Sequence, residues 1–85
     1  MFDESRRWRL SDHVSLRDES FGALAYHHDT RRLVFLKSRD LVELVRRLGD
    51  FESARRAVDE LVAVGERDRY LRALASLSSS GLISA

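Results

Sequence analysis

The sequence predicts an α+β domain in which a three-stranded antiparallel sheet is followed by three helices. Residues 13–36 have the pattern of strands, with clear apolar–polar alternation in the first of them, whereas residues 38–79 repeat with a period near 3.6. A chain of 85 residues has room for one modest core and not for a deep enclosed cleft. We therefore expect a single domain over residues 13–85. Residues 1–12 are expected to form a loose N-terminal tail whose Trp8 covers an exposed part of the sheet.

The composition is that of a folded protein with nearly balanced charge. Apolar residues make up 44% of the chain and charged residues 34%, with a formal net charge of +1. Acids follow bases closely, as in SRDLVELVRRLGD, so we expect the arginines on solvated helix faces. The chain has no Cys, no apolar signal segment and no run of about 18 apolar residues. These features predict a cytoplasmic protein without disulfides.

The first two strands are indicated by alternation and by small residues. Val14 and Leu16 share one face of the first strand, which is expected to break at the segment DES. The second strand is expected over residues 21–28, where Gly22 and the alanines let another backbone or a helix come close. Sequential strands usually lie side by side, so the three strands are expected to form a meander.

The third strand, expected over residues 31–36, carries the segment LVFL with no polar residue to face solvent. One edge of this strand pairs with the second strand, and the other edge is left with unpaired N–H and C=O groups. Proteins usually protect such an edge with Pro, an inward charge or a bulge, and none of these occurs within LVFL. Arg31, Arg32 and Lys37 instead place positive charge at both ends of the strand.

Three interpretations of this edge follow from the residues alone. An extended peptide, acidic or of mixed charge, adds to the sheet as a further strand. Alternatively, the helices and tail of the chain bury both faces of the strand, or two copies pair edge to edge as a homodimer.

The three helices are predicted from their apolar stripes and end signals. Ser38 is expected to cap the first helix, which ends at Gly49. The second helix is expected to start near residue 50 or 51 and to end at Gly65. The third is expected over residues 66–79, with Gly81 as a stop before Leu82 and Ile83 fold back. These helices must pack on one another and on the sheet, because short helices are not stable alone.

The segments FGALAYH and TRRLVFLKS, with the closing YLRALASLSSSGLIS, resemble the PqqD-like peptide chaperones. These are recognition elements for ribosomally made, post-translationally modified peptides (RiPPs). Among them, the chain is most similar to the small mycofactocin biosynthesis chaperones, over residues 8–84. The resemblance implies a winged-helix-like fold without catalysis and without a cofactor of its own.

The resemblance also implies how such a domain acts. The leader region of a precursor peptide binds as an added strand beside the third strand, in a groove walled by the third helix. The precursor is then presented to a radical S-adenosylmethionine (SAM) maturase of the SPASM type. This enzyme carries iron–sulfur clusters and modifies a Val-Tyr pair at the C-terminus of the precursor.

The expected peptide-binding residues come from the third strand and from one side of the third helix. Tyr70 belongs to the core stripe of the helix, and small residues beside it leave space for a peptide. The opposite flank, with Asp68 and Ala75, stays open as an alternative. The expected residues are Arg31, Arg32, Leu33, Val34, Phe35, Leu36, Lys37, Arg69, Tyr70, Ala73 and Ser76.

Other functions have weaker support in the sequence. His27 and His28 are adjacent on a strand and point to opposite faces, so no metal site is expected. No catalytic or phosphate-binding motif is present. The main alternative is a winged-helix DNA-binding protein, because the third helix carries several arginines. Acids alternate with these arginines, however, and the strands precede all three helices.

Overall fold

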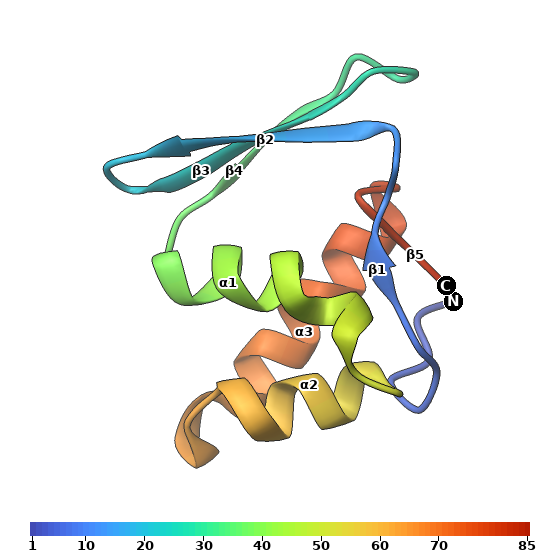
Figure 1. The fold of residues 1–85 in the computed structure, drawn as a ribbon, viewed down its shortest axis with the longest axis vertical. Helices are drawn as coiled ribbons and strands as arrows, with labels where there is room; N and C mark the ends of the chain where they lie inside the picture. Colours follow the sequence, from blue (N-terminus) through green and yellow to red (C-terminus); the bar gives the residue numbers. More distant parts are fainter.

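The computed structural model describes all 85 residues and confirms the α+β class. A three-stranded sheet lies across one end of a bundle of three helices (Figure 1). The strands of this sheet are β2 (Val14–Glu19), β3 (Gly22–His27) and β4 (Leu33–Leu36). The helices are α1 (Arg39–Arg47), α2 (Ala54–Leu61) and α3 (Arg67–Ser79). Short elements complete the chain: β1 (Arg9–Leu10), β5 (Ile83–Ser84) and the 3₁₀ turns η1 (Leu48–Asp50) and η2 (Val64–Glu66).

The sheet is the expected antiparallel meander in the order β2-β3-β4, with somewhat different strand ends. β2 continues through Glu19, because Asp18 and Glu19 still pair with Ala23 and Gly22 of β3. β4 begins at Leu33 and not at Arg31. The backbone of Arg31 has a φ of 61°, a left-handed conformation that belongs to the turn and cannot continue a strand.

The helix ends follow local capping. Ser38 caps α1 as expected, and its hydroxyl accepts a hydrogen bond from the Leu41 amide at 3.0 Å. The second helix starts later than expected, because Phe51 has extended backbone and Ser53 is the residue that caps α2. After α3, Gly81 adopts a φ of 78°, which allows the chain to turn back into β5.

The expectation of a loose N-terminal tail is wrong. β1 pairs antiparallel with β5, and Trp8 is only 8% exposed. The Trp8 indole donates a hydrogen bond to the Asp3 carbonyl at 2.7 Å, and the backbone of residues 8 and 9 lies against Gly49. The segment therefore packs beside the helices and does not lie over the sheet. Whether a domain boundary falls after residue 12 stays a prediction.

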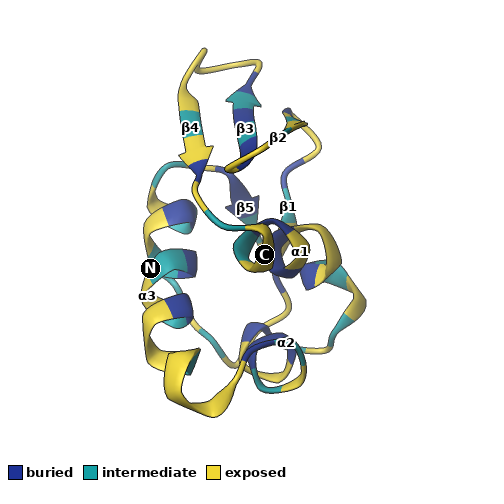
Figure 2. Ribbon diagram, turned by 90° about the vertical axis from the view of Figure 1, so that its left-hand side faces the viewer, coloured by how far each residue is buried: buried dark blue, intermediate teal, exposed yellow.

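The core lies between the inner face of the sheet and the helices (Figure 2). Ala23 and Ala25 of β3 and Leu36 of β4 supply the most deeply buried side chains of the sheet. The largest fully buried side chains come from β4, from the three helices, from η1 and from the segment after α3: Leu36, Leu44, Val45, Leu48, Val58, Leu74 and Leu82. The helices thus cover one face of β4 and leave its other face uncovered.

Position 22, at the start of β3, requires glycine because the structure has no space there for a Cβ atom. The φ of Gly22 is 148°, and a Cβ atom would lie 2.0 Å from the carbonyl oxygen of Leu36. We predict that Gly22→Ala lowers the free energy of unfolding by about 2 kcal/mol, because the strained backbone and the clash must both be relieved. Urea denaturation followed by circular dichroism measures this loss. Gly65→Ala is the control, since no atom lies within 4 Å of its Cβ; equal effects of the two substitutions would contradict the prediction.

Candidate functional site: the free edge of β4 and the groove beside α3

β4 is one of the two edge strands of the sheet, with β2 at the other edge, and its outer side has no strand partner. The His27 amide donates to the Arg32 carbonyl at 2.9 Å, so residue 32 faces β3. In an antiparallel pair this direction alternates, and Val34 and Leu36 therefore also turn their N–H and C=O groups toward β3. Leu33 and Phe35 turn theirs outward. These two residues supply the free hydrogen-bonding groups of the edge.

The side chains of β4 divide in the same alternating way. Leu36 is 1% exposed in the core and Val34 is half-buried, whereas Leu33 and Phe35 are 52% and 53% exposed on the outer face. The interpretation that the helices and tail bury both faces of this strand is therefore wrong. Only its inner face is covered.

A groove with two hollows runs between β4 and α3. The first hollow, of about 190 Å³, lies where β4 leads into α1 and is lined by Lys37, Ser38, Leu41, Arg69, Tyr70 and Ala73. The second, of about 420 Å³, lies near the start of β4 and is lined by Arg32, Leu33, Val34, Ser76, Leu77, Ser79 and Ser80.

Eight of the eleven residues expected from the sequence line these two hollows. Leu36 is instead in the core, Phe35 is on the outer face, and Arg31 is in the turn before β4. The flank of α3 with Ala73 and Ser76 lines the groove, whereas Asp68 and Ala75 line neither hollow.

The sequence reading missed the groove residues Ser38, Leu41, Leu77, Ser79 and Ser80. Ser38 was identified only as a helix cap. Its position directly after the strand was the signal that it also ends the groove.

Hydrogen bonds and stacking hold the wall of the first hollow. The Tyr70 hydroxyl and the Ser38 hydroxyl are 3.2 Å apart, which joins α3 to the start of α1. The guanidinium of Arg69 lies 5.4 Å from the centre of the Tyr70 ring and is also paired with Glu66. These contacts hold the side chains that form the wall of the hollow in place in the structure without a ligand.

The ends of β4 carry positive charge that no acid of the chain neutralises. Eleven ion pairs are present in the structure, and none involves Arg31, Arg32 or Lys37. An extended segment with acidic residues at its ends would therefore meet free cations at both ends of the strand.

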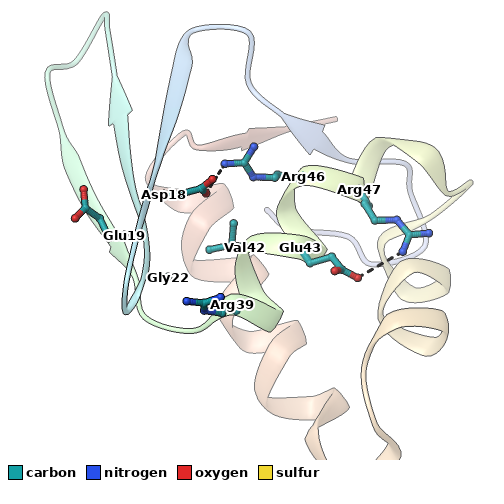
Figure 3. A pocket seen from close by; sticks show the side chains of 8 residues that line it. All are labelled: Asp18, Glu19, Gly22, Arg39, Val42, Glu43, Arg46 and Arg47. Carbon is teal, nitrogen blue, oxygen red and sulfur yellow. Dashed lines mark hydrogen bonds and ion pairs between the residues drawn. The ribbon is translucent and has the colours of Figure 1, made fainter.

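A different hollow, of about 450 Å³, lies between α1 and the β2–β3 hairpin (Figure 3). Arg46 pairs with Asp18 at 2.8 Å, and Arg47 pairs with Glu43 at 3.5 Å. Since most of its charged side chains already have partners within the molecule, a charged ligand would have to displace them. In the groove beside β4, Arg69 is paired with Glu66, but Arg32 and Lys37 have no such partner to displace.

The histidines have local partners instead of a shared centre. Nδ1 of His27 accepts hydrogen bonds from the amides of Asp29 and Thr30, whereas His13 contacts the Asp29 carboxylate at 3.0 Å. His28 lies 2.6 Å from the Ser15 hydroxyl.

None of the helices is long and apolar enough to cross a membrane.

The fold and the groove define a small α+β domain with a free sheet edge beside a helix, the geometry used to recognise extended peptides by strand addition. Comparison with known families makes the assignment specific. The chain belongs to the peptide chaperone MftB family, whose model matches residues 7–84. The family assignment confirms the resemblance found in the sequence.

Curated relatives agree with the family assignment. The chain is 41% identical to the peptide chaperone MftB of Mycobacterium tuberculosis, over 96% of this chain and 76% of that protein. It is 45% identical to the peptide chaperone MftB of Mycolicibacterium smegmatis, over 96% of this chain and 81% of that protein.

A solved structure shares the fold. Lasso peptide synthetase B1, solved in complex with the leader peptide, superposes with a TM-score of 0.69 at 21% sequence identity. The match covers 93% of this chain and 99% of the other. This likeness supports the sheet and helix arrangement described above.

The direction of the backbone groups in β4 predicts different effects of proline at neighbouring positions. Val34→Pro should destabilise the protein, because it removes an N–H that faces β3. Phe35→Pro should cost much less, because its N–H faces solvent and edge strands tolerate proline. Urea denaturation of both variants checks this order. A larger loss of stability for Phe35→Pro would show that the backbone directions are reversed.

Proposed function

We propose that this chain is a non-catalytic chaperone that binds the leader region of a RiPP precursor as a fourth strand beside β4. The observation that carries the proposal is the pair of outward-facing backbone groups at Leu33 and Phe35, which lie next to a groove walled by α3. Membership of the peptide chaperone MftB family supports the chaperone role. The solved lasso peptide synthetase B1, which has the same fold, was captured with a leader peptide.

The groove indicates the character of the ligand. Alternate side chains of an added strand point to opposite faces, so every second leader residue enters the hollows beside α3. Ala73 and Ser76 are small, which leaves room there for a larger side chain of the leader. The free cations at Arg31, Arg32 and Lys37 favour acidic residues on either side of the bound segment. A strand of this kind is expected to bind with a dissociation constant between about 1 nM and 1 μM.

The proposed partner of the loaded chaperone is a radical SAM maturase of the SPASM type in mycofactocin biosynthesis. The family assignment and the curated relatives support the peptide-binding part of this role. The contact with the maturase and a cytoplasmic location stay predictions. The alternative of a DNA-binding winged helix receives no support from the comparisons.

Calorimetric titration with the leader of the mycofactocin precursor tests the proposal. The unsubstituted chain should bind this peptide and should not bind the precursor with its leader removed. Phe35→Pro should lower the affinity by at least about tenfold relative to Phe35→Thr, because only the proline removes the outward N–H.

Asp18→Pro is the matched control. Asp18 lies on β2, where the alternation of backbone bonds turns its N–H to the opposite free edge of the sheet. This variant should keep the full affinity. No binding by the folded, unsubstituted chain would exclude leader recognition by this domain alone, and equal losses in both proline variants would exclude β4 as the specific edge.

A homodimer through the β4 edge is the other proposed use of the same backbone groups. The two uses exclude each other, so saturating leader peptide should leave only a complex of one chain with one peptide. Sedimentation velocity with and without peptide measures this change. A dimer that persists while leader is bound would place the dimer contact away from β4.

A further inference from the structure

The outer face of the sheet, which points away from the helices, carries an apolar patch that shares only Leu33 with the groove. Phe21, Leu33 and Phe35 are the exposed members of this patch, and Leu24 and Tyr26 are half-buried between them and β2. The rings of Phe21 and Phe35 pack with their centres 5.7 Å apart.

The patch becomes more apolar toward the free edge. One row across the sheet runs from Ser15 on β2 through Tyr26 on β3 to Leu33 on β4. Each member of the row lies opposite the next, and Leu33, the last one, is the most apolar.

The neighbouring row runs from Arg17 through Leu24 to Phe35 and shows the same order. In both rows a polar residue lies on the far strand and an exposed apolar residue on the edge strand. Both rows therefore end in an exposed apolar side chain on β4, at the edge where a further strand would be added.

We propose that the leader peptide is read on both faces of the sheet, and that it completes these two rows with a pair of apolar residues two positions apart. This inference rests on the proposed function. Leu33 and Phe35 are the residues with outward backbone groups, and their side chains lie on the outer face. Residues of an added strand opposite them must therefore place their side chains beside Leu33 and Phe35, at the distance of a cross-strand pair.

The substrate class is thus a strand that is apolar on both faces and acidic at its ends. Its inward residues occupy the hollows beside α3, and its outward residues cover Leu33 and Phe35. A strand with one polar face could fill the hollows of the groove with its apolar side chains but would leave the outer patch exposed to solvent.

The test uses calorimetry with a synthetic leader peptide of the mycofactocin precursor. The double variant Leu33→Thr/Phe35→Thr keeps both N–H groups and a strand-forming residue at each position, and it removes only the apolar side chains. We expect an affinity loss of about tenfold. Val64→Thr, an exposed apolar position on η2 away from the sheet, should bind like the unsubstituted chain.

Two further peptides assign the faces. In one peptide the odd-numbered residues of the bound segment are replaced by Thr, and in the other the even-numbered residues are, so that each peptide changes one face of the strand. Both sets of replacements should weaken binding to the unsubstituted chain. One set should lose most of its effect in the Leu33→Thr/Phe35→Thr variant, because substitutions of side chains that contact each other are not additive.

The outcomes separate this inference from the proposed function. Unchanged leader affinity in the double variant, with full binding by the unsubstituted chain, would overturn two-faced reading and leave strand addition intact. Unchanged leader affinity with weaker capture of the purified maturase would also overturn it and assign the patch to the enzyme. If the unsubstituted chain does not bind the leader, the proposed function and this inference fail together.

Discussion

The register of β4 is the constraint on which the rest of the structure depends. Backbone groups and side chains alternate together along a strand, so the residues that bond to β3 also point into the core. Leu36 fills that core, and its carbonyl closely approaches Gly22. A shift of one residue would expose Leu36 and force Phe35 inward. The stability of the fold and the free groups at Leu33 and Phe35 are therefore fixed by the same register.

The size of the side chains on α3 converts this free edge into a groove. Leu74 and Leu77 anchor the helix in the core, while Ala73 and Ser76 on the adjoining flank are too small to fill the space beside β4. The contact between the Tyr70 and Ser38 hydroxyls ties the helix to the end of the strand. The hollows are thus a consequence of helix packing, and they exist without any movement of the helix toward a ligand.

Local signals made the main elements and the free edge predictable from the sequence. The LVFL run, the Ser38 cap and the Gly81 stop each depend on neighbouring residues only. The position of the N-terminal segment did not follow, because the burial of Trp8 and the pairing of β1 with β5 join opposite ends of the chain. The outer apolar patch also could not be predicted from the sequence, because the register of three strands determines which residues lie side by side in its rows.

The charges at the ends of β4 bear on whether its free edge pairs with a second copy of the chain or with a peptide. In a symmetric antiparallel pairing of two β4 strands, the register that sets Leu33 against Phe35 of the second copy brings Arg31, in the turn before β4, toward its Lys37. Like charges brought close together destabilise a strand pair, and here they would meet at both ends of the paired segment. An acidic peptide reverses the sign of this interaction at the same positions. Arg31 and Lys37, which oppose self-association in this register, therefore favour an acidic foreign strand over a second copy of the chain.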